Sequence, residues 1–335
     1  MSTDQIVLGL HDGRPAAAWL RDGRLHDLLI DPKGDGPRPG AVYRAVCDRP
    51  VKGQGGMFVK LPDGLSGWHR NAKGLKPGQE ILVQVSGHAE PGKAVPVTDR
   101  VLFKSQLCIV TPDAPGVNVA RSVKDEDTRE RLLEIAHDRL PETRGRIGLI
   151  LRSAAALADP DDIEADIDET WAVAQSVLQD RGSGPEHLLD GPDAQMQAWR
   201  EWPKAPVVED WGIVLDHLDA LRSPRVTLGP VTVWIEPTRA LVAVDVNTPE
   251  TGAGGLRANL AMVKELPRQL RLRGLGGQIV LDLAPMPKKD RRGFEAALRA
   301  AFRDDPVETS LIGWTPLGHF ELTRRRERIP LEELL

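Results

Sequence analysis

The stretches VTVWIEPTRALVAVDVN at residues 231–247 and QIVLDL at residues 278–283 decide the fold of the C-terminal third of the chain. The first predicts two consecutive strands joined by a short turn. The second predicts a buried strand, because its apolar residues are nearly continuous. Between them, apolar residues recur at three- and four-residue steps over residues 256–273, which is typical of a helix with one buried face. A hairpin, a helix and another strand predict an α/β fold.

Two carboxylates stand at the ends of these strands. Asp245 ends one strand and Asp282 ends the next, with a single helix between them. A strand–helix–strand crossover places its strands side by side or one strand apart, so both carboxylates can meet at one edge of the sheet. Asn247 follows two residues after Asp245 and faces the same way in an extended chain.

These three side chains predict a site of hard oxygen ligands, which suits Mg²⁺ with several retained waters and also accepts Mn²⁺. Such an ion can polarise a phosphodiester and activate water as a nucleophile. The alternative is that Asp245 and Asp282 only cap the helices or turns that follow their strands, which is a common role of Asp. Spacing alone leaves both roles open.

Short strands dominate the N-terminal part of the chain. Residues 1–36 predict strands with a two-residue turn at Asp22-Gly23, because Asp-Gly pairs are typical of tight hairpins. Five β-rich runs separated by glycine turns follow within residues 37–100, and they predict a small closed barrel such as an OB-fold. OB-folds bind single-stranded nucleic acid through exposed aromatic and cationic side chains.

A middle region and a C-terminal core complete the expected organisation. Residues 101–224 predict strands, helices near 124–138 and 161–180, and a Gly- and Pro-rich irregular segment at 182–206. Residues 225–335 are the expected α/β core.

The composition is that of a soluble globular protein, with 335 residues of which 41% are hydrophobic and 28% charged. No apolar run is long enough to cross a membrane, and the N-terminus lacks the basic start of a signal peptide. We therefore expect a cytoplasmic protein without a membrane partner. Cys47 and Cys108 are the only cysteines and lack a CxxC spacing. This excludes a disulfide framework and a thiolate zinc site built within one chain, so no zinc is expected.

Acidic residues are concentrated in one part of the chain. The net charge is −5, but residues 155–220 contain 16 acidic and only 3 basic residues. The rest of the chain therefore carries a net positive charge, and a basic groove with an acidic back can still bind nucleic acid.

Three C-terminal stretches resemble the catalytic region of the ribonuclease E/G family: ALVAVDVN at 240–247, NLAMVKELPRQLRLRGLGGQIVLDL at 259–283 and LGHFELTRRR at 317–326. The resemblance implies a ribonuclease-H-like fold around the site. It also implies that an Asp-x-Asn on one strand and an Asp on the next hold a catalytic Mg²⁺. The matching residues are Asp245, Asn247 and Asp282, with the two aspartates as metal ligands.

The resemblance extends to the expected barrel. GMFVKLPDGLSGW at 56–68 is similar to a family segment that carries two aromatic residues on the RNA face of an inserted OB-fold. The resemblance places Phe58 and Trp68 at those positions and Lys93 at a basic, RNA-contacting one. The alternative is that both aromatic side chains belong to the barrel core.

QLCIVTPDAPGVNVARSV at 106–123 and GLILRSAA at 148–155 resemble the family's sensor for a 5′-monophosphate. The resemblance implies that Arg152 and Ser153 bind the terminal phosphate, for which a guanidinium and a hydroxyl are suited. Ala155 stands where the family usually has Gly. The alternative is a structural Arg152 held by a salt bridge.

Arg324 and Arg326 match family positions near the catalytic edge and would contact RNA phosphates; the alternative is a solvated run of arginines. The chain departs from the family pattern in two ways. The stretch before Asp245 is short, and the cysteine-containing zinc link is missing. Zinc-linked assembly is therefore not expected, and the oligomeric state stays open.

The sequence thus predicts a Mg²⁺-dependent endoribonuclease that hydrolyses single-stranded RNA, prefers a 5′-monophosphate and acts in RNA processing or decay. One alternative is a relative that binds RNA without efficient cleavage, since fold alone does not determine activity. A DNA-specific nuclease is less favoured because of the barrel.

Overall fold

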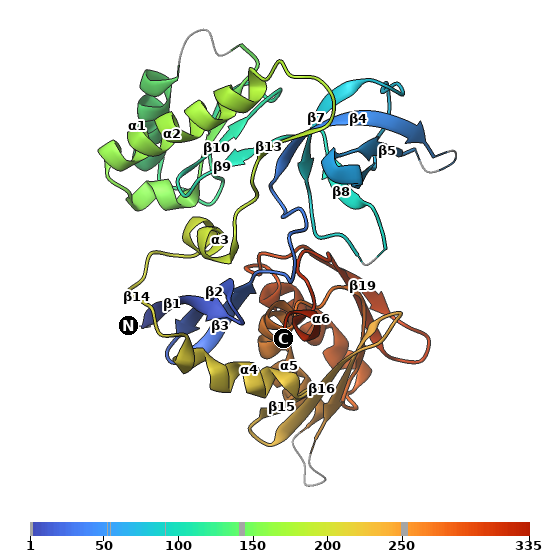
Figure 1. Ribbon diagram of the computed structural model, residues 1–335. Coiled ribbons are helices and arrows are strands. Elements are labelled where there is room, and N and C mark those ends of the chain that lie inside the picture. The colour runs from blue at the N-terminus through green and yellow to red at the C-terminus, as the bar shows by residue number, and fades with distance from the viewer. Residues whose placement is uncertain (1–2, 52, 54, 91, 141–144, 249–253) are drawn as a thin grey trace. The chain divides into compact units, whose positions relative to one another are not determined.

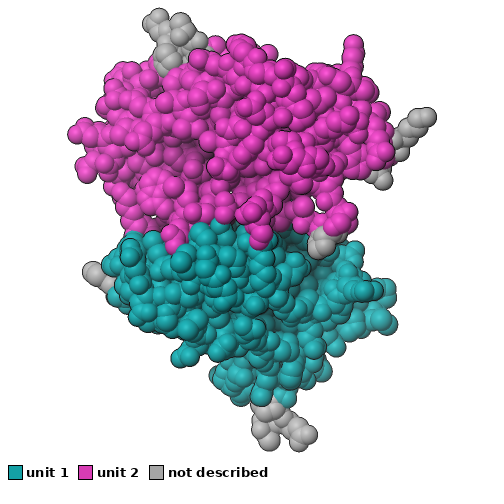
Figure 2. Space-filling model, in the orientation of Figure 1, with its two compact units in different colours: residues 1–33, 205–335 teal, residues 34–204 magenta. Residues whose placement is uncertain are grey.

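The computed structural model describes residues 3–335 except 52, 54, 91, 141–144 and 249–253 (Figure 1). The chain forms two compact units (Figure 2). Unit 1 contains residues 1–33 and 205–335, and unit 2 contains residues 34–204. None of the helices in the described part of the chain is long and apolar enough to cross a membrane.

The N-terminal strands of unit 1 form a four-stranded sheet in the order β14-β1-β2-β3. Its strands are β1 (Asp4–His11), β2 (Arg14–Arg21), β3 (Arg24–Ile30) and β14 (Val207–Val208). The predicted turn at Asp22-Gly23 is present, and both residues have positive φ angles of 51° and 72°. Such angles at both turn residues belong to the tightest hairpins, and Asp-Gly tolerates them well.

A six-stranded sheet forms the rest of unit 1, in the order β15-β16-β17-β18-β20-β19. Its strands are β15 (Arg225–Leu228), β16 (Val231–Pro237), β17 (Val242–Asn247), β18 (Gly277–Asp282), β19 (Thr309–Trp314) and β20 (Phe320–Arg324). β17 and β18 are adjacent and parallel, as the crossover rule predicts. The mixed α/β character is thereby confirmed, whereas the finer ribonuclease-H-like assignment stays a prediction.

Helices cover one face of this sheet. They are α5 (Gly255–Leu272) and α6 (Arg291–Ala301), while α4 (Leu215–Arg222) and α7 (Leu331–Leu334) complete unit 1 together with the 3-10 turns η4 (Trp211–Val214) and η5 (Lys288–Asp290). The core between sheet and helices includes Val233, Val244, Leu266, Leu270 and Phe294. Because alternate strand residues point into this core, the residues between them point to the opposite face of the sheet.

Unit 2 contains the predicted barrel. Five strands close it in the order β4-β5-β6-β8-β7, with β7 paired back to β4. They are β4 (Val42–Pro50), β5 (Met57–Lys60), β6 (Ser66–His69), β7 (Glu80–Val85) and β8 (Val95–Thr98), with a short turn η1 (Pro62–Gly64). Small apolar side chains such as Val59, Val83 and Val97 fill its interior. The prediction of an OB-like five-stranded barrel is confirmed.

The remainder of unit 2 is a second sheet with packed helices. Its strands follow the order β11-β12-β10-β9 and are β9 (Phe103–Lys104), β10 (Cys108–Thr111), β11 (Val117–Val119) and β12 (Gly148–Leu151). The helices are α1 (Glu126–Arg139), α2 (Pro160–Leu178) and α3 (Ala194–Glu201), with a 3-10 turn η3 (Ser153–Leu157). The two predicted helices therefore lie within one or two residues of their expected positions.

The segment 182–206 is more regular than we predicted. It contains α3 and the strand β13 (Glu186–Leu189), which pairs with β4 of the barrel. The reason is tertiary. The buried guanidinium of Arg44 on β4 binds Asp180 and Glu186 and donates to Gly184 O at 2.7 Å, which holds this part of the chain against the barrel.

Residues 205–224 also lie elsewhere than their place in the expected middle region implies. They belong to unit 1, where Val207 and Val208 on β14 pair with Ile6 and Val7 on β1.

Candidate functional site

The acidic pair lies on two adjacent strands of unit 1. Asp245 on β17 and Asp282 on β18 are directly opposite each other in the parallel register. Neighbouring strands lie about 4.8 Å apart, and residues in register point to the same face. Val244 and Leu281, one position earlier on each strand, are in the core. The two carboxylates therefore face away from the helices, at the end of both strands, as the sequence predicts.

Each carboxylate has one close partner from its own chain. Asn247 Nδ2 donates to Asp245 Oδ2 at 2.6 Å. His319 Nδ1 lies 3.2 Å from Asp282 Oδ1. Neither aspartate caps a helix, because α5 begins after Gly254 and η5 begins after Pro287. The capping alternative is therefore excluded for the helices that follow these strands.

The donor set fits a magnesium ion. Two carboxylates and one amide oxygen are hard ligands, and Mg²⁺ is commonly bound through one or two carboxylates with water completing its shell. Among the described residues, no lysine or arginine forms an ion pair with Asp245 or Asp282. The same part of the chain holds no cluster of three or more His, Cys, Asp or Glu side chains arranged for a metal. Two like charges in register, without a lysine or arginine partner among the described residues, favour a bound cation.

Two side chains that were not predicted from the sequence lie beside this pair. Trp234 on β16 lies opposite Asp245, and Arg225 on β15 lies opposite Trp234, so both belong to the same row across the sheet. Trp234 is half-buried and Arg225 is exposed. The signal was the alternation in VTVWIEP, where Val233 and Ile235 face the core and Trp234 faces away. An indole at this place offers a surface on which a base can stack.

The barrel presents the two predicted aromatic residues together. Phe58 on β5 lies opposite Trp68 on β6, with ring centroids 5.1 Å apart. Both are half-buried and lie outside the barrel core, whereas their neighbours Met57 and Val59 are within it. Gly56 lies against the indole, since a Cβ there would come within 2.3 Å of the Trp68 ring. The alternative of two core aromatics is therefore excluded.

A cationic side chain lies against one of these rings, and another cation is exposed on the same unit. The guanidinium of Arg49 lies 5.2 Å from the centroid of Phe58, a contact that the sequence analysis missed because β4 is irregular at this point. Lys93 is exposed and pairs with Glu90 at 2.5 Å. An exposed pair of this kind contributes little to stability, so Lys93 can exchange Glu90 for another anion at low cost.

The sensor-like Arg152 is bound to its own unit. Its guanidinium donates to Ser105 O at 2.6 Å, to Arg200 O at 2.8 Å and to Glu201 Oε2 at 2.5 Å. Its side chain is only 19% exposed. Ser153 is exposed at the start of η3. The salt bridge named as the alternative is present, and the guanidinium of Arg152 is already paired with the carboxylate of Glu201.

The two arginines lie at the other end of β18 from Asp282, since Arg324 pairs with Gly277 at the start of that strand, so the expectation that they lie beside the acidic pair is wrong. Arg324 is buried and forms an ion pair with Asp305 at 2.8 Å, with both side chains 1% exposed. This placement supports a role in folding and leaves the Arg324 side chain almost no surface for RNA. Arg326 is exposed, and its guanidinium lies over Gly277, within 2.7 Å of where a Cβ would be.

Arg324 belongs to a buried charge network in unit 1. Arg271 binds Asp305 at 2.5 Å and Asp27 at 3.5 Å, and Arg328 donates to Asp27 at 3.0 Å. Burial raises the pKa of Asp27, but the positive charges of Arg328 and Arg271 outweigh it and hold that pKa below its usual value. Paired in this way, the charges join β3, α5 and the C-terminal segment.

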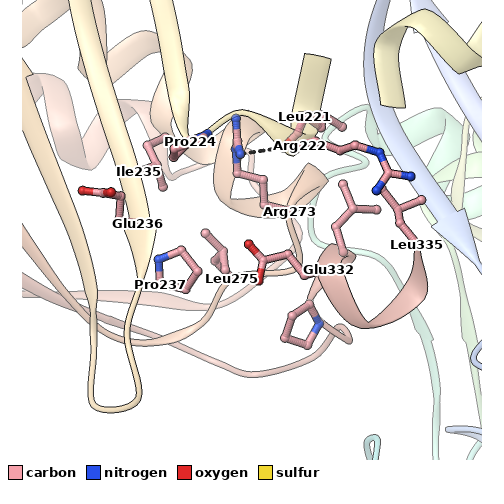
Figure 3. Close-up of a pocket in the computed structure, with 12 residues that line it drawn as sticks. Leu221, Arg222, Pro224, Ile235, Glu236, Pro237, Arg273, Leu275, Glu332 and Leu335 are labelled. Carbon is pink, nitrogen blue, oxygen red and sulfur yellow. Dashed lines mark hydrogen bonds between the residues drawn. The ribbon is translucent and has the colours of Figure 1, made fainter. Parts of the chain in front are cut away.

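A cavity of about 430 Å³ elsewhere in unit 1 is lined by none of the predicted site residues (Figure 3). Arg273 lies in its wall, and its three nitrogens donate to Gln269 Oε1, Leu221 O and Ser223 O at 3.0, 2.8 and 2.8 Å. Arg273 thus holds α5 to the end of α4. Each nitrogen of this guanidinium therefore already makes a hydrogen bond within the chain.

Both cysteines are buried, Cys47 in the barrel core and Cys108 on β10 in the second core of unit 2. Burial raises the pKa of both thiols, that of Cys108 to about 12. Metal-binding thiolates form more readily where the pKa is lowered.

Comparison with known proteins agrees with the resemblance. A profile of the Ribonuclease E/G family matches residues 103–209 and 200–327. Ribonuclease G from Salmonella typhimurium (strain SL1344) is 27% identical over 404 aligned positions, which cover 99% of this chain and 82% of that protein. Ribonuclease E from Escherichia coli (strain K12) is 25% identical over 378 positions, covering 92% of this chain and 35% of that protein. Ribonuclease E from Nostoc sp. (strain PCC 7120 / SAG 25.82 / UTEX 2576) is 27% identical over 78% of this chain and 45% of that protein. The chain belongs to the ribonuclease E/G family.

Proposed function

We propose that this protein is a Mg²⁺-dependent endoribonuclease that hydrolyses internal phosphodiesters of single-stranded RNA in RNA processing or decay. The observation that carries the proposal is the register of Asp245 and Asp282 at the ends of adjacent parallel strands, on the face away from the core. Membership of a ribonuclease family supports the choice of RNA as substrate.

The residues of the site have separate tasks in this proposal. Asp245 and Asp282 hold the ion, and Asn247 fixes one oxygen of Asp245 through its 2.6 Å hydrogen bond. When bound, Mg²⁺ lowers the pKa of a coordinated water and neutralises charge on the phosphate. Trp234, next to Asp245 in the same row, stacks on a base beside the cleaved bond and thereby positions the strand.

The barrel supplies sequence-tolerant binding. Phe58 and Trp68 stack on successive bases, while Arg49 and Lys93 attract the backbone. Such stacking requires bases that are not paired in a duplex, which favours single-stranded RNA over double-stranded RNA. Arg326 adds an exposed cation in unit 1 for phosphate.

Any preference for a 5′-monophosphate requires the phosphate to replace a carboxylate on Arg152. Arg152 binds Glu201 at 2.5 Å, so a terminal phosphate has to replace this carboxylate. Exchanging one anion for another gains less than binding to a free guanidinium. We therefore propose that Arg152 and Ser153 give only a weak preference for a 5′-monophosphate in this protein.

One experiment tests the central proposal. A labelled AU-rich single-stranded RNA is incubated with the protein in Mg²⁺ or in EDTA, alongside Asp282→Asn and the matched control Asp304→Asn, an exposed aspartate of the same unit. We expect internal cleavage by the parent and the control in Mg²⁺, and no cleavage in EDTA or by Asp282→Asn. Binding of the RNA without cleavage by the parent would favour the RNA-binding alternative. Faster cleavage of the same sequence as DNA would favour the DNA nuclease.

A further inference from the structure

His319 lies beside the acidic pair, although the family motif gives it no role. β18 and β20 are antiparallel with Leu281 opposite Phe320, so the next position brings His319 opposite Asp282. Its Nδ1 lies 3.2 Å from Asp282 Oδ1, and the two side chains are 34% and 65% exposed. The two atoms are within ion-pair distance, and an imidazole N–H that approaches an ionised carboxylate can only donate to it.

The backbone that carries His319 is firmly held. His319 is the last residue of the turn between β19 and β20. In this turn Thr315 N donates to His319 O at 2.8 Å, and His319 N donates to Thr315 Oγ1 at 3.1 Å. Gly318 has a φ of 94°, which favours glycine at this point of the turn. At the end of β19, Trp314 Nε1 donates to Glu295 at 2.6 Å. The imidazole therefore extends toward Asp282 from a well-supported turn.

We propose that His319 is a positioning residue: it binds Oδ1 of Asp282 and thereby turns Oδ2 toward the metal ion. This inference rests on the proposed function. Asn247 has the same relation to the other carboxylate, since its amide donates to Oδ2 of Asp245 and not to Oδ1. Each carboxylate of the pair thus uses one oxygen for a contact within the chain and keeps one for the ion.

The donor matters because Asp282 is so exposed. A carboxylate on a solvated strand end samples several rotamers, and Mg²⁺ demands near-ideal geometry from the ligands it receives. Hydrogen bonds to metal ligands fix their orientation, and removing one typically weakens metal binding about 10–100-fold. We expect about tenfold here, at the lower end of that range, since water can replace part of the lost contact at an exposed site.

Metal binding without RNA provides a test that does not depend on turnover. The dissociation constant for Mn²⁺ is measured on the full chain by electron paramagnetic resonance of the free ion. His319→Ala is expected to raise it about tenfold, as for other hydrogen-bond partners of metal ligands. His319→Asn, which retains an N–H donor near the position of Nδ1, is expected to recover most of the affinity. His217→Asn on α4 is the matched control and should bind like the parent.

Asp282→Asn separates this inference from the proposed function. If the His319 variants bind Mn²⁺ like the parent while Asp282→Asn does not, the metal site stands and the positioning role of His319 is wrong. If His319→Asn is as weak as His319→Ala, with both folded by circular dichroism, the hydrogen bond is not what counts and the proposal is overturned. If parent and Asp282→Asn bind Mn²⁺ equally, the metal site of the proposed function fails, and this inference fails with it.

Discussion

The acidic pair of unit 1 and the sensor-like arginine of unit 2 were both inferred from the same family resemblance, yet their surroundings differ. Asp245 and Asp282 each contact one side chain and keep an oxygen that no described side chain binds. Arg152 binds two carbonyl oxygens and the carboxylate of Glu201. A motif residue can act on a ligand only where its neighbours leave it bonding capacity.

The same contrast appears elsewhere in the chain. Phe58 and Trp68 are half-buried with their faces outside the barrel core, whereas Arg324 is enclosed with Asp305. The comparison predicts that substitutions at side chains that keep an accessible face or an unused oxygen change function with little effect on folding. Substitutions at side chains whose hydrogen-bonding groups are already used within the chain, such as Arg324, should change folding more than function.

The largest effect should come from the acidic pair. Asp245→Asn and Asp282→Asn are each expected to lower the rate of RNA cleavage by several orders of magnitude, because either change removes a metal ligand. The double variant should be hardly worse than either single one, since both changes disable the same ion. Thermal unfolding should show equal or higher stability, because the repulsion between the carboxylates is relieved. Additive losses in single-turnover rates would contradict a shared ion.

The barrel aromatics should come next. Phe58→Ala or Trp68→Ala is expected to weaken binding of a single-stranded RNA by about 1–3 kcal/mol for each base that loses its stack. Lys93→Ala should mainly reduce the dependence of binding on salt concentration. Fluorescence anisotropy at several salt concentrations measures both effects. Unchanged affinity in folded variants would mean that RNA uses another surface.

Trp234 lies opposite Asp245 on the neighbouring strand, and substituting it tests whether the accessible surface beside the acidic pair also binds RNA. Trp234→Ala is expected to lower kcat/KM about tenfold, the value of one modest stacking contact, while Trp234→Phe retains most of it. Affinity for RNA should change less than kcat/KM, because the barrel provides most of the binding. A Phe variant as weak as the Ala variant would argue against stacking.

Glu201→Gln removes the carboxylate that pairs with Arg152 and tests whether this contact limits phosphate binding. The parent should cleave 5′-monophosphorylated RNA only slightly faster than 5′-hydroxyl RNA. Without the competing charge, Arg152 should gain up to about tenfold preference for the monophosphate, the worth of one charge-assisted hydrogen bond. The ratio of initial rates on the two RNAs measures this change. A strong preference for the monophosphate in the parent would contradict this prediction, because it would mean that phosphate easily displaces Glu201 from Arg152.

The smallest effect concerns His26, which lies against Trp19 and near Arg271 in unit 1. Burial and the positive charge of Arg271 lower the pKa of His26 from 6.5 to about 4. Between these values the unfolded chain binds a proton that the folded chain does not, so stability should fall as pH drops from about 6.5 toward 4. Urea unfolding at several pH values measures the slope, and His26→Gln should flatten it. The same slope in parent and variant would exclude His26 as the source.

Local pattern was enough for the elements of the acidic site. Continuous apolar runs predicted β17 and β18, and the intervening helical period predicted α5. The crossover rule then predicted strands side by side or one strand apart, and they lie side by side. The partner of Asp282 could not be predicted, because His319 reaches it through the register of β20, 37 residues further along the chain.

The sequence by itself determined the family, the five-stranded barrel, the strand–helix–strand unit and the common face of Asp245 and Asp282, because these depend on periodicities and turns within short stretches. Only the tertiary structure decided which polar side chains are occupied. Arg152 meets Glu201, and Arg324 meets Asp305, through contacts between distant segments. A guanidinium looks the same in a sequence whether or not the fold supplies its acceptor, and that acceptor determines whether it is free to bind RNA.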